Sequence, residues 1–589
     1  MTALKSKWQE YIYNAITAAA TKAGVDAGID SADKIMVGNP PKPEMGDFSF
    51  AMFPFAKAFK TAPTAIAAMV VSELESNTEV IAAGSLSTAG PYVNVKVDIS
   101  DTASEVLDVV ISQGEEYGKV ETLAGKKIMV EFSCPNTNKP LHLGHLRNDS
   151  IGACISRILD AAGASVMKVN LINDRGIHIC KSMLAYKKFG GDTRPESEGV
   201  KSDHFVGNYY VKFDQWSKED EKAIEGAQKM LQDWEAGDAE TTELWRQMNK
   251  WTIDGIEQTY KATGISFDKV YYESNTYASG KEEVIKGLED DVFYKEDDNS
   301  IWIDLSDIKL DKKVLLRGDG TSLYMTQDLG TAIARHTDWP FDQLIYVVGS
   351  EQQYHFSVLF HILKKLGYKW ADDLKHLSYG MVNLPDGKMK SREGTVVDAD
   401  DLVKQLTGLA REEIVSKERG DEVDDLDTTA HSIALGALNY YLLQVTPSKD
   451  MIFNPAESLS FNGNTGPYLQ YMGARISSML RKFEEKKVDF TGIEADASLL
   501  TVEEEKEIIK MLISWPEKVE QAAAEYNPSC LTAFMYELAK TFSRFYHDNP
   551  VLKNENKQLA VTRLKLSSAV LQVLKNGFSL IGIPFLEKM

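Results

Sequence analysis

The chain has 589 residues, of which 43% are hydrophobic and 26% are charged. This length exceeds what one hydrophobic core supports, so about three or four domains are expected. No apolar run approaches the roughly 18 residues of a membrane span, so we expect no membrane segment and no membrane partner. The formal net charge of −22 argues against nonspecific nucleic-acid binding, because attraction to phosphates requires clustered lysine and arginine.

The N-terminus and the cysteines both indicate the cytoplasm. Residues 1–5 lead into a polar helical pattern, without the apolar core and cleavage site of a signal peptide. The cysteines form no CxxC pair and are too sparse for a disulfide scaffold, which suits a reducing compartment. They are Cys134, Cys154, Cys180 and Cys530.

Residues 1–112 are predicted to form a small α/β domain. Residues 8–23 have helical periodicity, and residues 90–97 read as a strand that closes the domain.

Residues 113–385 are predicted to form an α/β domain around a doubly wound parallel sheet of the Rossmann type. Two successive passes of strand, helix and strand indicate this fold, because such units build nucleotide-binding sheets. The expected elements are strand 127–132, a helix from residue 143, strand 166–172, strand 343–349, helix 352–366 and strand 377–384. Between the two passes, residues 185–290 are acidic and are predicted to be a helical insertion.

The rest of the chain is predicted to be almost wholly helical. Residues 386–460 begin with a glycine-bounded basic loop, and residues 461–589 show apolar stripes at helical spacing, as in a bundle. Residues 471–589 contain 16 basic and 16 acidic side chains, so the acidic excess lies upstream and this segment tolerates a polyanionic partner.

The strongest candidate for chemistry is the run PNTNKPLHLGH, which begins at Pro135 and ends at His145, where a predicted strand turns into a helix. Helix N-terminal amides favour phosphate, and Gly144 allows a nucleotide to approach the backbone. His142 and His145 can donate hydrogen bonds to phosphate oxygens. This pattern favours an ATP site.

Other interpretations of these two elements stay open on the residues alone. The two histidines could be structural, or could bind a metal together with Cys134 or His178, although no clean four-ligand spacing follows. The basic loop GKMKSREGT could close on a triphosphate, or could be an ordinary solvated turn.

The run of residues 135–145 resembles the HIGH signature of the class I aminoacyl-tRNA synthetases, and the lead-in EFSCPN at residues 131–136 is similar to that of the arginyl branch. The resemblance implies that His142 and His145 bind the ATP phosphates, with Gly144, and stabilise the transition state. In that state, the amino-acid carboxylate attacks the α-phosphate.

The basic loop resembles the KMSK loop of the same family, but it lacks the final lysine. In the arginyl branch a lysine just upstream of HIGH substitutes for it, and Lys139 occupies that place. The resemblance implies catalytic roles for Lys139 and Arg392, and it leaves open whether Lys388, Lys390 or Arg392 contributes most. The remaining ATP contacts that it implies are Met381, Val382, Lys390, Ser391 and Arg392.

A pocket selective for arginine needs carboxylates and acceptors, because a guanidinium offers five donors in a rigid fork. The resemblance matches Glu131, Tyr324 and Asp328 to contacts with the substrate side chain, and Asn136 and Gln352 to contacts with its amino and carboxylate groups. Tyr324 and Asp328 are four residues apart, one helical turn, so they can face one pocket. Without the resemblance, Asp328 would be interpreted as a surface residue or a cap.

The resemblance implies an arginine–tRNA ligase that forms arginyl-adenylate and pyrophosphate, then transfers arginine to the terminal ribose of its tRNA. The expected partners are ATP with magnesium on its phosphates, L-arginine and tRNA, with no protein-bound metal and no DNA, and a monomer is expected. Bound tRNA is expected to be required for adenylate formation.

The end domains are also assigned by resemblance. Residues 1–112 resemble an additional domain that contacts the corner of tRNA, residues 386–460 would contact the tRNA stem, and residues 461–589 resemble a DALR-type anticodon-binding bundle. The rival hypotheses are a class I synthetase for glutamine, glutamate or cysteine, and a catalytically silent paralogue that binds tRNA or another protein.

Overall fold

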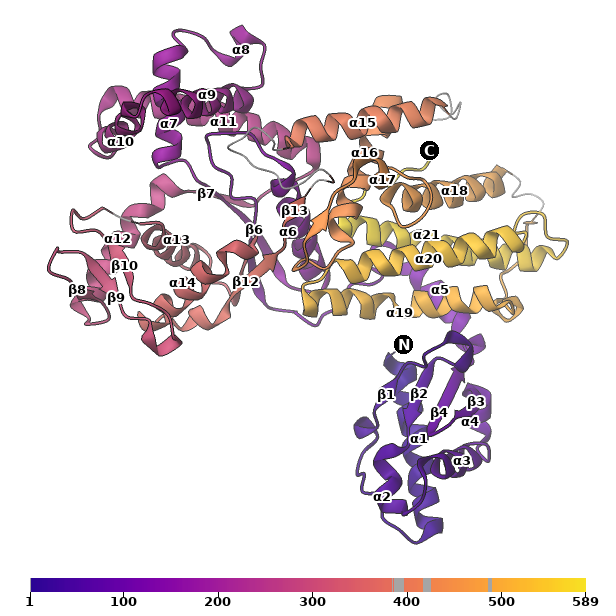
Figure 1. Cartoon of the computed structure of the whole chain (residues 1–589). Coiled ribbons are helices and arrows are strands. Elements are labelled where there is room, and N and C mark those ends of the chain that lie inside the picture. Colours follow the sequence, from indigo (N-terminus) through magenta and orange to yellow (C-terminus); the bar gives the residue numbers. More distant parts are fainter. Residues whose placement is uncertain (1, 322, 384, 386–396, 417–424, 486–489) are drawn as a thin grey trace. The chain divides into compact units, whose positions relative to one another are not determined.

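The structure is a computed structural model that describes residues 2–321, 323–383, 385, 397–416, 425–485 and 490–589 (Figure 1). These residues divide into two units. Unit 1 contains residues 1–118, 478–518 and 537–573, and unit 2 contains residues 119–477, 519–536 and 574–589.

Unit 1 begins with a four-stranded antiparallel sheet in the order β1-β2-β4-β3, packed against helices. Trp8 and Ile12 of the first helix are buried with Phe50 and Val93 of the sheet, which confirms the predicted α/β character of this region. The strands are β1 (Val37–Gly38), β2 (Phe48–Ala51), β3 (Gly84–Ala89) and β4 (Tyr92–Val97), and the helices are α1 (Thr2–Ala23), α2 (Ala56–Phe59), α3 (Pro63–Leu74), α4 (Thr78–Ala83) and α5 (Ser100–Gln113).

Unit 2 is built on a five-stranded parallel sheet in the order β12-β11-β5-β6-β7. The chain starts at β5, adds β6 and β7 on one side, and then adds β11 and β12 on the other. The strand order therefore reverses between β5 and β11, which confirms the predicted doubly wound topology. The strands are β5 (Lys127–Glu131), β6 (Ser165–Ile172), β7 (Lys269–Tyr272), β11 (Gln343–Gly349) and β12 (Leu374–Tyr379).

Two details of the predicted sheet were wrong. The helical interpretation of residues 185–290 omitted β7, a four-residue edge strand whose alternation is too short to recognise between the long helices α11 (Ala239–Thr263) and α12 (Glu273–Glu289). The strand expected at residues 377–384 begins earlier, as β12, and the chain breaks at Gly380 before the short strand β13 (Val382–Asn383), which pairs with β14 (Met451–Ile452).

Helices connect and cover the sheet strands. They are α6 (Leu143–Ala161), α7 (Ile177–Phe189), α8 (Pro195–Glu198), α9 (Ser202–Glu219), α10 (Lys222–Glu235), α11 (Ala239–Thr263), α12 (Glu273–Glu289), α13 (Tyr324–Asp338) and α14 (Gln353–Lys365). Between α12 and α13 in the sequence, three short strands form a small antiparallel sheet. They are β8 (Tyr294–Lys295), β9 (Ile301–Ile303) and β10 (Lys313–Leu316). Its apolar side chains share one core with α13, α14 and the central sheet.

The described residues beyond β13 are mainly helical, as predicted for the chain after Asp425. Their helices are α15 (Ala399–Ser416), α16 (Leu426–Leu443), α17 (Pro455–Ser458), α18 (Gly466–Glu485), α19 (Glu503–Glu525), α20 (Ser529–Asp548) and α21 (Lys557–Ile581). Among the described residues, none of the helices has the length and apolar character needed to cross a bilayer.

Candidate active site

The HIGH-like run begins at the carboxyl end of β5, beside the point where the strand order reverses. Just before it, Ser133 and Cys134 take left-handed backbone conformations, with φ of 75° and 49°. Such conformations are uncommon for residues other than glycine and cost free energy. Side chains of the neighbouring elements hold the turn, since Asn148 accepts the Ser133 N–H at 2.5 Å and Asn170 accepts the Cys134 N–H at 3.0 Å. The turn directs the chain from the strand into α6.

The two histidines of the run cap the N-terminus of α6. His142 is the N-cap residue, and its Nδ1 accepts the Gly144 N–H at 3.1 Å. The Nδ1 of His145 accepts the His142 N–H at 3.1 Å. Their rings lie 3.9 Å apart between centroids. Because both Nδ1 atoms accept backbone hydrogen bonds, the proton of each neutral ring must lie on Nε2.

Both rings are neutral at pH 7. Burial, followed by the charge of Lys139, lowers the pKa of His142 to about 4. Burial and then the neighbouring His142 and Lys139 lower the pKa of His145 well below its ordinary value. The histidines therefore offer Nε2–H donors to an anion without carrying charge themselves, and the local cation is Lys139.

Lys139 and His142 line a cavity of about 170 Å³ in front of α6. Burial lowers the pKa of Lys139. The cavity is also lined by Pro140, Leu141, His204, Gly207, Asn208, Tyr210, Val211 and Asp398.

Met381, one of two adjacent predicted ATP contacts, is held against α6 by the fully buried Arg147, and the other, Val382, is buried in one core cluster with Leu146 of α6. The Arg147 guanidinium donates to the carbonyl oxygens of Gly380 at 2.6 Å, Met381 at 2.9 Å and Lys449 at 2.7 Å. Sequence reasoning missed Arg147. The predicted basic-loop residues Lys388, Lys390, Ser391 and Arg392 lie outside the described residues.

Glu131, predicted to bind the substrate side chain, has an internal arginine as its partner. It ends β5 and is 4% exposed, and its carboxylate forms an ion pair with Arg335 of α13, which is 1% exposed. The Arg335 guanidinium carbon lies 5.1 Å and 5.8 Å from the ring centroids of Tyr271 and Tyr346. The structure thus places a buried guanidinium next to the region where a substrate guanidinium was expected.

The other predicted arginine contacts lie near the same edge of the sheet. Tyr324 begins α13 and is 66% exposed, and Asp328 lies one turn later, so the predicted helical spacing is confirmed. Asp328 Oδ2 is 2.5 Å from Nε2 of His355 on α14. Asn136 and Gln352 are both exposed, the first after β5 and the second after β11.

Glu273 is a further buried carboxylate that sequence reasoning missed. It follows β7 at the start of α12 and is 5% exposed. Burial raises its pKa to about 8; the charge of Arg175 opposes this shift and that of Asp328 adds to it. Although Tyr324 is largely exposed, partial desolvation raises its pKa; the charge of Glu273 adds to this shift and that of Arg175 opposes it. Glu273 therefore belongs to the same electrostatic neighbourhood as the predicted pocket.

The alternative of a metal centre at the histidine pair has no support in the described part of the chain. There, the one group of three possible metal-ligating side chains is Asp203, His204 and Asp400. Neither Cys134 nor His178 joins His142 and His145 in such a group.

Family models match along most of the chain. The catalytic domain of class I (R) tRNA synthetases matches residues 106–455, the DALR anticodon binding domain matches residues 469–589, and the arginyl tRNA synthetase N terminal domain matches residues 6–97.

Full-length relatives match as well. The arginine–tRNA ligase of Treponema denticola is 57% identical, covering 100% of both chains, and that of Treponema pallidum is 53% identical, covering 94% of this chain and 95% of the relative. Among solved structures, the arginyl-tRNA synthetase of Thermus thermophilus superposes with a TM-score of 0.78 at 25% identity, covering 98% of this chain and 99% of that one.

Proposed function

The chain belongs to the arginyl-tRNA synthetases of class I, so it activates arginine with ATP and transfers it to tRNA, and on this premise we propose which side chains do so. Membership of this family excludes the rival synthetases for glutamine, glutamate and cysteine. Since no side-chain nucleophile is required, the protein contributes by positioning the reactants and stabilising charge.

We propose that the ATP phosphates lie against the N-terminus of α6. His142 and His145 donate from Nε2–H, the amide of Gly144 borders the nucleotide, and Lys139 supplies positive charge. As the arginine carboxylate attacks the α-phosphorus, negative charge grows on the phosphate oxygens and the donors bind more strongly. The nucleotide contacts are completed by Met381, Val382, Lys390, Ser391 and Arg392.

We propose that the arginine side chain is bound by Asp328, Tyr324 and Glu131. The Asp328 carboxylate is partly buried, and it exchanges its hydrogen bond with His355 for one from the substrate guanidinium. The Glu131 carboxylate forms the buried wall of the pocket, and its ion pair with Arg335 holds it in place. Asn136 and Gln352 bind the amino and carboxylate end of arginine.

Magnesium enters with ATP. The side chain beside the histidines is the cation Lys139, a poor ligand for a metal ion, so the phosphate oxygens hold the magnesium. We propose that residues 1–112 bind the corner of tRNA, residues 386–460 its stem and residues 461–589 its anticodon. The family resemblance supports a monomer that works in the cytoplasm and needs bound tRNA for adenylate formation.

The observation that supports this proposal most directly is the pair of histidines with both Nδ1 atoms engaged in the helix cap. The test is exchange of pyrophosphate into ATP with each amino acid, with and without total tRNA. Exchange with arginine and tRNA together is expected. Exchange with arginine alone would remove the tRNA requirement, and exchange with another amino acid would refute the pocket.

A further inference from the structure

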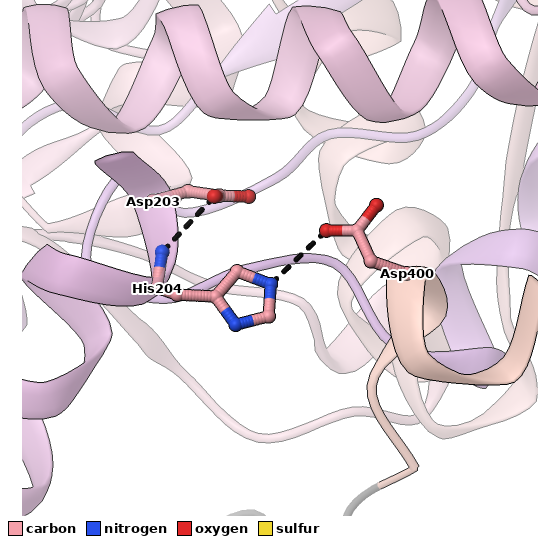
Figure 2. Close-up of side chains that lie close together, drawn as sticks. All are labelled: Asp203, His204 and Asp400. Atoms are coloured by element: carbon pink, nitrogen blue, oxygen red, sulfur yellow. Dashed lines mark hydrogen bonds and ion pairs between the residues drawn. The ribbon is translucent and has the colours of Figure 1, made fainter. Parts of the chain in front are cut away.

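A charged cluster joins the start of α9 to the start of α15, and Figure 2 shows three of its side chains, Asp203, His204 and Asp400. We call it the charged clamp; its members are Lys201, Asp203, His204, Asp398 and Asp400. Lys201 Nζ lies 2.6 Å from Asp400 and 3.2 Å from Asp203. His204 Nε2 lies 3.0 Å from Asp400 and 3.4 Å from Asp398.

Helix α11 also contributes to the charged clamp. Its Thr259 hydroxyl donates to Asp400 Oδ1 at 3.0 Å and accepts from Lys201 Nζ at 2.6 Å. Both oxygens of Asp400 therefore have partners from other helices. An aspartate at the first turn of a helix needs no such partners, because the helix terminus alone favours it.

The segment that carries these aspartates pairs with the backbone of the HIGH-like run. The N–H of Leu143 donates to the carbonyl of Val397 at 3.0 Å, and the N–H of Ala399 donates to the carbonyl of Leu141 at 3.0 Å. His142 and Asp398 form the β-bridge between these bonds. The charged clamp thus anchors a strand that lies directly against the histidine proposed to bind ATP.

The same segment follows the basic loop in sequence, since residue 397 comes directly after residues 386–396. It also borders the cavity in front of α6, because His204 and Asp398 line that cavity together with Lys139 and His142. The members of the charged clamp are therefore close to the nucleotide site without belonging to its proposed phosphate contacts.

Charge balance within the charged clamp depends on His204. Asp203 is completely buried, and Asp398 and Asp400 are partly buried, so three carboxylates face the ammonium of Lys201 and the imidazole of His204. The hydrogen bond to Asp400 raises the pKa of His204, which burial opposes. Burial alone would raise the pKa of Asp400, but the hydrogen bonds from His204 and Lys201 outweigh it and lower the pKa to about 2.

Asp203, His204 and Asp400 each offer one possible metal-ligating atom, and these atoms lie within 4.8 Å of one another. The ammonium of Lys201 already contacts two of these three side chains, Asp203 and Asp400, and supplies the positive charge that a metal would bring. The geometry therefore favours the Lys201 ammonium, rather than a metal ion, as the partner of these carboxylates.

We propose that Lys201, His204 and Asp400 are positioning residues for arginine activation, because they hold residues 397–399 against Leu141–Leu143 and so fix the ATP-binding histidines. This inference rests on the proposed placement of ATP at His142 and His145. It predicts that losing the charged clamp impairs the use of ATP and leaves arginine binding intact, since the arginine contacts lie on other elements.

The test is pyrophosphate exchange with arginine and tRNA in Asp400→Asn, His204→Gln and Lys201→Met enzymes. We expect kcat/KM for ATP to fall about 10- to 100-fold with a raised KM for ATP, the scale of a misplacement of about 1 Å. KM for arginine should not change. Partial unfolding would lower kcat alone, so the KM for ATP separates positioning from a loss of folded enzyme.

Matched controls are available on the same helices. Asp401→Asn removes an exposed carboxylate one residue away and should leave KM for ATP unchanged. Lys201→Arg keeps the charge and should recover most of the loss seen in Lys201→Met. If Asp400→Asn behaves like Asp401→Asn, the proposal is wrong.

Dependence on pH gives a second readout. Since the raised pKa of His204 means that its proton is lost as pH rises, KM for ATP should increase on the alkaline side in the natural enzyme. His204→Gln should lose this part of the profile, and identical profiles in both proteins would overturn the role of His204.

Two further outcomes would overturn the inference in different ways. Stoichiometric zinc or manganese in the purified enzyme, absent from Asp400→Asn, would show a metal in place of Lys201. His142→Asn serves as the reference for the ATP site. If it impairs the use of ATP and Asp400→Asn does not, the proposed role of the charged clamp is wrong and the proposed ATP site stands. If neither variant does, the proposed ATP site fails and the inference falls with it.

Discussion

Two roles of His145 can be separated by one pair of substitutions. His145→Ala removes both the Nδ1 acceptor that caps the His142 N–H and the Nε2–H donor proposed to face the phosphates. In His145→Asn the amide oxygen can take the place of Nδ1 and keep the cap, while the shorter side chain no longer places a donor at the position of Nε2. The difference in stability and activity between His145→Ala and His145→Asn measures the contribution of the cap. The loss of activity that remains in His145→Asn measures the contribution of the donor.

The expected magnitudes differ enough to be told apart. Loss of a helix cap costs about 1 kcal/mol of stability, which should lower the midpoint of thermal unfolding of His145→Ala but not of His145→Asn. Loss of one donor to a developing charge slows the chemical step roughly 100-fold or more, and 100-fold corresponds to about 2.7 kcal/mol. Both variants should therefore show slow arginine activation.

The assay is single-turnover formation of arginyl-adenylate with saturating arginine and tRNA, run beside equilibrium binding of arginine. Arginine affinity should stay near that of the natural enzyme in both variants. Activation at the natural rate in His145→Asn would refute the donor role and leave His145 as a cap only.

Three further predictions concern charged and titratable residues of the proposed arginine and ATP sites. Asp328→Asn should weaken arginine recognition by about 2 to 5 kcal/mol, the range for truncating one partner of a buried charge pair, and an unaltered KM for arginine would refute the pocket. Arg335→Met leaves the Glu131 carboxylate buried without its partner and should destabilise unit 2 by about 3 to 5 kcal/mol, measured by chemical unfolding; Glu131→Gln in the same background should recover part of that loss, and no recovery would contradict the pairing. Stability should fall as pH drops from about 6.5 toward 4, because the unfolded chain binds the His142 proton there while the folded protein does not; His142→Gln should flatten this slope, and an unchanged slope would contradict the lowered pKa.

Much of the catalytic fold is predictable from the sequence because its central strands are apolar runs flanked by clear helices. The strand expected at residues 343–349 has those bounds in the structure, and β5 and α6 begin where expected. Strand β7 could not be found in this way, because it is a short edge strand with lysine, valine and tyrosine side chains between amphipathic helices. Its place in the sheet depends on pairing with β6, which no local pattern encodes.

The candidate site also contains residues that the sequence predicts and residues that only the tertiary structure shows. Motif resemblance predicts the histidines, Lys139 and Asp328 as site residues, because they sit in distinctive runs. It could not identify Arg335 as the partner of Glu131, although one signal was present: Arg335 lies seven residues after Asp328 and therefore on the same face of α13. A charged residue on the buried face of a helix implies a buried partner, but only the tertiary structure shows which carboxylate it is.

If arginine and ATP bind at the proposed places, the arrangement of carboxylates explains how a protein with many acidic side chains accommodates both. Glu131 ends β5, Glu273 follows β7 and Gln352 follows β11, so these polar groups around the proposed arginine site come from the carboxyl ends of separate strands of one sheet. On the phosphate side the acidic charge is neutralised internally, because Lys201 and His204 pair with the aspartates beside the HIGH-like run. An unpaired Asp400 there would repel the triphosphate, whereas Asp328 is proposed to exchange its bond with His355 for one from the substrate guanidinium. The same residue type therefore acts in opposite ways at the two places, depending on whether its partner is a fixed internal cation or is exchanged for the substrate.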